Sequence, residues 1–186
     1  LGAYDRADIE TVQENEQSID MLADAVNNYL VCLSGHMEAD DNSVLLNYYL
    51  QCFSEFERIG DYAVNLTESA EELHARGAQF STTARQELAV LQDALHEIMG
   101  YAADAFTTRQ ARVARHIEPV EEVVDDMVAT LRTNHIRRLR DGQCTVYAGL
   151  VFLDILINAE RIADQCSNLG VYTISQFDPS VMNSHH

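Results

Sequence analysis

The chain has 186 residues, of which 12 are basic and 30 acidic, and its formal net charge is −18. Nucleic acid and anionic membrane surfaces are bound through clustered Lys and Arg, so this charge argues against both and favours cations or basic partners as ligands. Two prolines, eight glycines and a hydrophobic fraction of 47% favour an all-α protein with a proper core.

Helical periodicity dominates the chain. It predicts five long helices, near residues 5–33, 43–75, 83–106, 109–140 and 144–175. Short connections between long helices favour antiparallel neighbours, so the sequence predicts an up-and-down helical bundle.

Glycine follows the end of three periodic stretches, at Gly35, Gly77 and Gly142. A left-handed C-terminal cap favours glycine at such positions. Thr83 with Gln86, and Thr107 with Gln110, have the spacing of a capping box at a helix start. Pro119 lies within the fourth predicted helix and is expected to kink it.

The cysteines are far apart in sequence and fall on predicted helices among apolar neighbours, at Cys32, Cys52, Cys144 and Cys166. We therefore expect buried free thiols and a cytosolic compartment. The longest nearly apolar run, residues 144–157, is too short to span a bilayer.

One ten-residue pattern occurs twice, 103 residues apart (160 − 57). Residues 57–66 are Glu-Arg-Ile-Gly-Asp-Tyr-Ala-Val-Asn-Leu, and residues 160–169 are Glu-Arg-Ile-Ala-Asp-Gln-Cys-Ser-Asn-Leu, with six positions identical. Each copy places a Glu and an Asp one turn apart on one helix face, where a metal ion or a cationic partner can bridge them. Two copies in one chain indicate a duplicated unit with a duplicated site.

A weaker match supports the duplication. Residues 16–20 align with residues 121–125 at a spacing of 105 (121 − 16), so each unit contains at least two helices with one Glu-x-x-x-Asp each. The helix near 83–106 has no counterpart upstream. The sequence therefore predicts two three-helix units with the first helix missing: residues 1–77 with two helices, and residues 78–186 with three helices and a short C-terminal tail.

These motifs resemble the PhoU family, whose repeats carry Glu-Arg-Ile-Gly-Asp-His-Ala-x-Asn-Ile on the third helix of each three-helix bundle. The resemblance covers about residues 9–176, and Tyr62 and Gln165 stand where the family usually has His. It is closest to the PhoU-like domain that follows the membrane portion of sodium/phosphate cotransporters. It implies a regulator of phosphate transport, in the cytoplasm and tethered to the inner membrane in the full-length protein.

The resemblance also implies a metal site in each unit, with iron as the metal and zinc, manganese or magnesium as alternatives. The first site would be formed by Glu16, Asp20, Glu57 and Asp61, and the second by Glu121, Asp125, Glu160 and Asp164. The implied partner is the transporter portion of the same protein or another phosphate-transport protein. The missing helix would leave an apolar seam, so we also expect self-association into a homo-oligomer.

Other interpretations of the repeated motifs remain open at this stage. Arg58, Arg161 or other basic side chains could neutralise the carboxylates in ordinary ion pairs, which would leave a metal-free, acidic protein-interaction module. Asn65 and Asn168 could orient the carboxylates, or they could form hydrogen bonds across a helix interface.

An enzymatic function is not expected. A ferritin-like di-iron oxidase needs Glu-x-x-His on each of two helices, and only Glu71-x-x-His74 has this spacing. The sequence contains no recognisable nucleophilic arrangement and no Gly-rich phosphate loop.

Overall fold

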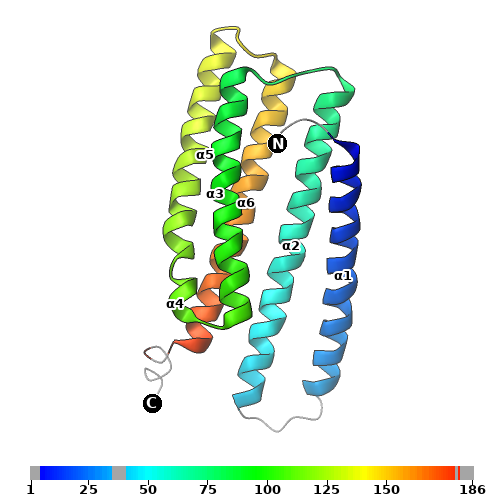
Figure 1. The fold of residues 1–186 in the computed structure, drawn as a ribbon, viewed down its shortest axis with the longest axis vertical. Coiled ribbons are helices and arrows are strands. Elements are labelled where there is room, and N and C mark those ends of the chain that lie inside the picture. Colours follow the sequence, from blue (N-terminus) through cyan, green and yellow to red (C-terminus); the bar gives the residue numbers. More distant parts are fainter. Residues whose placement is uncertain (1–4, 35–40, 179, 181–186) are drawn as a thin grey trace.

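The computed structural model describes residues 5–34, 41–178 and 180, and these residues contain helices and no strand. Five long helices confirm the predicted all-α bundle (Figure 1). They are joined by one short helix, and their bounds are α1 Arg6–Ser34, α2 Asp41–Ala75, α3 Thr82–Thr108, α4 Ala111–Ala114, α5 Ile117–Arg140 and α6 Val146–Phe177.

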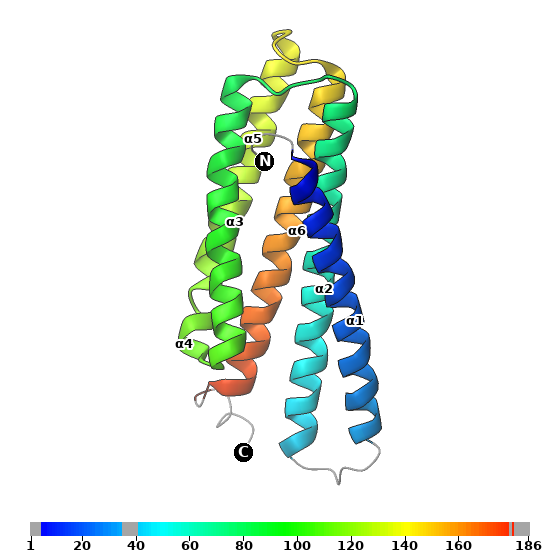
Figure 2. The ribbon, with the colours of Figure 1, turned by 45° about the vertical axis from the view of Figure 1, so that its right-hand side comes forward.

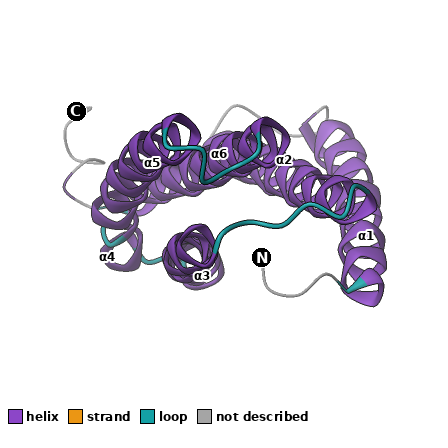
Figure 3. Ribbon diagram, turned by 90° about the horizontal axis from the view of Figure 1, so that it is seen from above, coloured by secondary structure: helices purple, strands orange, loops and turns teal. Residues whose placement is uncertain are grey.

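Four of the long helices stand side by side in a curved row in the order α5, α6, α2 and α1, and α3 packs on one side of this row against α5 and α6 (Figure 3). Figure 2 shows the same order from the side. Helix α6 is the centre of the packing, because it contacts α2, α3, α4 and α5. Helix α1 lies at the end of the row. Among the described helices, α2 is the one against which α1 packs extensively.

The core follows from the apolar face of each helix. On α3 the buried side chains recur at steps of three and four, as one helix face requires, at Ala84, Leu88, Leu91, Leu95, Ile98, Ala102 and Ala105. Helix α6 is buried over a wider arc because helices cover it on several sides. The predicted unit boundary at residue 77 falls between α2 and α3, and the division into two units stays a prediction.

The fourth predicted helix, 109–140, is wrong as a single element. The chain forms α4, turns through Arg115 and His116, and begins α5 at Ile117. Pro119 stands in the first turn of α5, where a backbone N–H has no partner within the helix, so its absence costs nothing. In a continuous helix the proline ring would clash with the carbonyl of the residue four positions earlier, Arg115, and the helix is interrupted there. The proline thus acts upstream of its own position, as a break and not a kink.

Two of the three predicted glycine caps are confirmed: Gly77 has φ of 59° and Gly142 has φ of 69°, and Gly35 lies outside the described residues. The predicted capping boxes are wrong. Ser81, not Thr83, caps α3, and its hydroxyl accepts a hydrogen bond from the Ala84 N–H at 3.2 Å. Helix α3 runs on past Thr107 and ends in Arg109, which adopts the left-handed conformation at φ 55°.

All four cysteines are free, but only Cys52 and Cys166 are buried as expected. Cys32 is exposed, and Cys144 is half-buried in the turn before α6. None of the described helices is long and apolar enough to cross a membrane.

Candidate functional site

The first carboxylate cluster lies between α1 and α2. The two helices pack against each other at Gly60, where a Cβ would be in ordinary van der Waals contact, 3.6 Å from Glu16 Cγ and 3.7 Å from Ile19 Cδ1. Desolvation raises the pKa of Glu16, and the neighbouring carboxylates of Asp20 and Asp61 raise it further. One carboxylate oxygen of Asp20, Oδ1, is buried without a hydrogen-bond partner.

Glu57, the fourth predicted member of this cluster, lies half-buried on α2 one turn before Asp61. Glu16 thus interacts electrostatically with Asp20 and Asp61. Glu57 is assigned to the same cluster because it lies on the same face of α2 as Asp61. We define these four residues as the α1–α2 cluster.

The second cluster lies between α5 and α6 and contains the four carboxylates that the sequence predicted, Glu121, Asp125, Glu160 and Asp164. Desolvation is the first cause of the raised pKa of Glu121, Asp125 and Asp164. For Asp125 and Asp164 the second cause is repulsion across the two helices, from Glu160 and from Asp125 respectively. For Glu121 the second cause is Asp125 on its own helix, and Asp164 of α6 contributes less. We call this set the α5–α6 cluster.

The alternative in which basic side chains neutralise the carboxylates holds for one carboxylate among the described residues, and through neither Arg58 nor Arg161. Arg58 pairs with Glu55 on its own helix at 3.3 Å, and the guanidinium of Arg161 lies over the Tyr62 ring, 5.6 Å from its centroid. Arg132, which the sequence did not single out, contacts Glu160 at 3.3 Å. One of the eight candidate carboxylates is therefore in an ordinary ion pair.

The donor set in both clusters consists of carboxylate oxygens, which suit Mg²⁺, Mn²⁺ and iron. The partnerless Asp20 oxygen and the mutual repulsion of the acids fit a bound cation, because a cation would relieve both. In the part of the chain that the structure describes, no three His, Cys, Asp or Glu side chains already converge as metal ligands. Binding would therefore require the carboxylates to turn toward one another.

The two asparagines of the repeated motif differ in their surroundings. Asn65 Nδ2 donates a hydrogen bond to Asn158 Oδ1 at 3.2 Å, which joins α2 to α6. This is the interhelical hydrogen bond that the sequence left open as an alternative. Asn168 is half-buried on α6, one turn after Asp164, and its predicted role in orienting the carboxylates stays a prediction.

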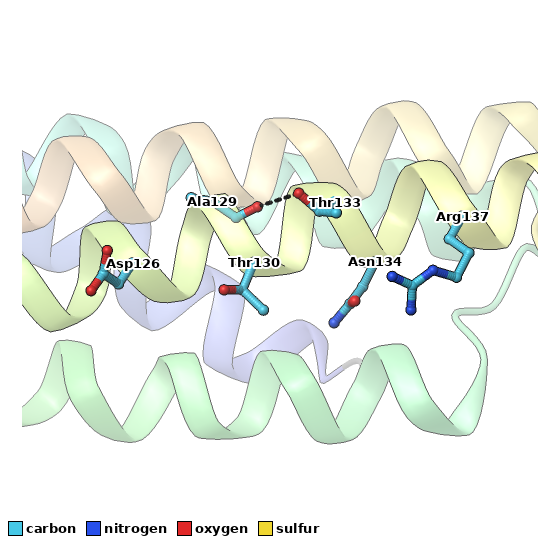
Figure 4. A pocket seen from close by; sticks show the side chains of 6 residues that line it. All are labelled: Asp126, Ala129, Thr130, Thr133, Asn134 and Arg137. Atoms are coloured by element: carbon cyan, nitrogen blue, oxygen red, sulfur yellow. Dashed lines mark hydrogen bonds between the residues drawn. The ribbon is translucent and has the colours of Figure 1, made fainter.

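An open hollow of about 600 Å³ lies along α5, apart from both carboxylate clusters (Figure 4). Its labelled lining residues are Asp126, Ala129, Thr130, Thr133, Asn134 and Arg137. A second hollow of about 420 Å³ lies between α3 and α5, with an apolar floor that includes Val90, Met127 and Leu131. Neither hollow contains a predicted metal ligand.

A buried polar contact that the sequence did not predict joins α3 to α5. Glu87 accepts hydrogen bonds from Asn134 Nδ2 at 2.8 Å and from Arg138 Nη1 at 2.6 Å. Arg138 is buried beneath this contact, and its guanidinium also lies 5.1 Å from the centroid of the Phe152 ring. No sequence signal links Glu87 to Arg138, because their pairing depends on how α3 is placed against α5.

The model of the PhoU domain family matches residues 1–70 and 88–173. The chain belongs to the PhoU family. The resemblance inferred from the repeated motifs is thereby confirmed.

Relatives of this PhoU-family chain are remote in sequence and close in fold. It is 26% identical over 120 residues to the phosphate-specific transport system accessory protein PhoU homolog 1 of Thermotoga maritima, which covers 64% of this chain and 51% of that protein. The chain therefore spans about half the length of that relative.

Two crystal structures share the fold. PhoU from Pseudomonas aeruginosa superimposes with a TM-score of 0.82 at 20% identity, over 90% of this chain and 80% of that one. The phosphate transport system regulatory protein PhoU from Streptococcus pneumoniae gives 0.79 at 19% identity, over 90% and 78% of the two chains.

At the two positions where the PhoU motif usually has His, the side chains of this chain pack within the helix bundle. Tyr62 is half-buried beneath Arg161. Gln165 is buried, and its Nε2 donates a hydrogen bond to the carbonyl oxygen of Arg161 at 3.2 Å. Both residues thus contact Arg161 of the second motif copy, Tyr62 from α2 and Gln165 from within α6.

Proposed function

We propose that this PhoU-family domain regulates phosphate transport, and that it does so through cation binding at the two carboxylate clusters. The observation that carries the proposal is the repetition of one arrangement: a Glu and an Asp on each of two packed helices, once on α1–α2 and once on α5–α6. Neighbouring acids raise the pKa of Glu16 in the first cluster and those of Glu121, Asp125 and Asp164 in the second, so each cluster would gain free energy from a bound cation.

The ligands of the first metal ion would be Glu16, Asp20, Glu57 and Asp61. Those of the second would be Glu121, Asp125, Glu160 and Asp164. For the second site Glu160 would exchange its contact with Arg132 for the metal. An ion held this way would tie α1 to α2 and α5 to α6, so its binding would change the stiffness of both helix pairs. The name of the Thermotoga maritima relative refers to phosphate-specific transport, and this supports a transport-related role.

The partner in this proposal is a membrane transporter, either as another portion of the same polypeptide, as in sodium/phosphate cotransporters, or as a separate phosphate-transport protein. The domain would then act in the cytoplasm beside the inner membrane. The motif resemblance to cotransporter domains supports this arrangement.

The direct test is the metal content of tag-free protein after incubation with iron, manganese, magnesium or zinc and removal of free ion. We expect bound metal in the wild type, with loss of one site in Glu16→Gln/Asp61→Asn and of the other in Glu121→Gln/Asp164→Asn. The matched control, Asp93→Asn/Asp154→Asn, removes the same charge at exposed positions outside the clusters and should keep both sites. Equal metal content in all four proteins would overturn the assignment.

A metal-free interaction module is the second candidate, and the Arg132–Glu160 ion pair favours it because that carboxylate is already neutralised. In this case the acidic clusters would dock basic side chains of a partner. Binding would weaken steeply with salt and would ignore chelators. A chelator-sensitive interaction with the transporter would reject this candidate.

A further inference from the structure

A histidine is buried where α5 packs against the first turns of α6. His135 is 1% exposed, and its ring stacks on Phe152 of α6 with the centroids 5.0 Å apart. Phe80, in the connection before α3, packs against the same phenylalanine with 5.7 Å between the ring centroids. The imidazole is therefore enclosed by the helices and has no access to bulk water.

One nitrogen of this ring lacks a hydrogen-bond partner. His135 Nε2 is buried, and no described residue donates to it or accepts from it. The contact with α6 is tight on this side, because a Cβ on Gly149 would lie 2.8 Å from Nε2. A neutral imidazole tolerates such a contact, since one of its nitrogens carries no proton. In the protonated ring both nitrogens are donors, so Nε2–H would be a buried, charged donor without an acceptor.

Two charged side chains face the ring, one from α5 and one from α3. Arg138 lies one turn after His135 and is 7% exposed, so its buried guanidinium opposes a second positive charge beside it. Glu87 of α3 would favour a protonated ring, but its carboxylate already accepts two hydrogen bonds from α5, at 2.8 and 2.6 Å. From α6 the ring meets Gly149 and Phe152, which carry no charge.

These surroundings lower the pKa of His135. Burial is the largest cause, the charge of Arg138 adds to it, and Glu87 opposes both. The folded protein therefore binds this proton less readily than the unfolded chain, in which an imidazole titrates near about pH 6.5. Stability from this source is complete above that pH and is lost as the pH falls below it.

We propose that His135 makes the α5–α6 contact pH-sensitive: the neutral ring holds the first turns of α6 against α5, and protonation drives the two helices apart at this end of the bundle. The proposal goes beyond the function proposed above, because His135 belongs to neither carboxylate cluster and no metal takes part. The same helix pair carries the α5–α6 cluster, so acidification would loosen the scaffold of that cluster.

The first test follows the imidazole in the wild-type protein, so it does not depend on the folding of a variant. The ring protons of His135 are identified in NMR spectra by their contact with the Phe152 ring, and their shifts are recorded between about pH 8 and 5 in chelator. We expect the midpoint of the His135 titration below about pH 6.5. A midpoint at or above this value would overturn the proposal, because the contact would then accommodate the charged ring.

The second test compares the pH dependence of unfolding in His135→Gln and in the wild type. Glutamine stays uncharged at every pH and keeps a polar side chain at this position. We measure the unfolding equilibrium constant at a fixed denaturant concentration, in chelator. Between about pH 7.5 and 5.5 that of the wild type should rise by up to about tenfold more than that of the variant, which is the factor that protonation of an ordinary imidazole contributes. The carboxylates titrate in both proteins, so the comparison removes their effect.

The matched control is His96→Gln, which makes the same change at an exposed position of α3 and should follow the wild type. A pH dependence that agrees within about twofold in the wild type and His135→Gln would overturn the proposal. An equal loss of pH dependence in His135→Gln and His96→Gln would do the same, because it would assign the effect to net charge. Chelator is present throughout, so a failure of the metal proposal leaves these results unchanged.

Discussion

The imidazole of His135 occupies the space that a side chain at Gly149 would need. A Cβ on Gly149 would lie 2.8 Å from His135 Nε2 and 2.9 Å from Cε1. The ring is buried and stacks on Phe152, with the centroids 5.0 Å apart. Helices α5 and α6 can pack this closely only because one of them has no side chain at the contact.

Gly149→Ala should therefore destabilise the protein although alanine is the better helix former. Overpacking a filled site lowers the unfolding free energy by about 1–3 kcal/mol, and the better helix propensity of alanine raises it by about 1 kcal/mol. At this tight contact we expect the overpacking cost to be the larger of the two. Denaturant unfolding measures the difference. The control is Gly100→Ala on α3, where nothing lies within 4 Å of the new methyl group, and this variant should be more stable than the wild type. A Gly149→Ala protein as stable as the control would contradict the clash.

Gly60→Ala should have the opposite sign from Gly149→Ala. Its Cβ would meet Glu16 Cγ at 3.6 Å and Ile19 Cδ1 at 3.7 Å, which is ordinary van der Waals contact, and the second motif copy has Ala163 at this position. We expect a gain of about 0.5–1 kcal/mol in unfolding free energy from the lower backbone entropy of the unfolded chain. A loss of stability would mean that α1 and α2 approach more closely than the structure shows.

The resemblance to the PhoU family implied which acids lie together, and helical periodicity with short loops predicted that their helices are antiparallel neighbours. Glu16 and Asp20 were expected beside Asp61, and Glu121 beside Asp164, and the raised pKa values of Glu16 and Glu121 report those neighbours. The antiparallel pairing of consecutive helices leaves few other registers for a motif that occurs at the same place in both units.

The contacts of α3 could not be predicted in the same way. They depend on the angle and height at which α3 crosses α5, and no short-range pattern encodes either. The pairing of Glu87 with Arg138 belongs to this class. The break before α5 was missed for another reason: Pro119 is compatible with a first turn, so its effect falls on Arg115, where the sequence carries no signal of its own.

Removing Glu87 measures how much the pairing of its carboxylate with Arg138 contributes to the stability of the α3–α5 contact. Glu87→Ala leaves the buried guanidinium of Arg138 without its carboxylate, and breaking a buried pair in this way costs about 3–5 kcal/mol. Asp141→Ala breaks the exposed pair of Asp141 with Arg140 and should cost less than about 1 kcal/mol. Thermal and denaturant unfolding of the two variants compares them. Equal losses would show that the Arg138 charge finds another partner or reaches water.

Neutralising the α5–α6 cluster should stabilise the domain near neutral pH. The pKa values of Glu121 and Asp125 are raised in the folded state, so the folded protein binds more protons than the unfolded chain as the pH falls through these raised values. Stability from this source therefore increases on acidification, and at neutral pH the ionised pair opposes folding.

In chelator, Glu121→Gln/Asp125→Asn should raise Tm at pH 7.5 by about 1–2 °C, since like-charge pairs on exposed helix faces are worth a few tenths of a kcal/mol each. The gain should shrink as the pH is lowered, because the wild-type acids then take up protons themselves. Asp93→Asn/Asp104→Asn makes the same change in net charge on exposed positions of α3 and controls for it. A gain that is equal in both variants, or independent of pH, would mean that net charge and not the cluster governs the effect.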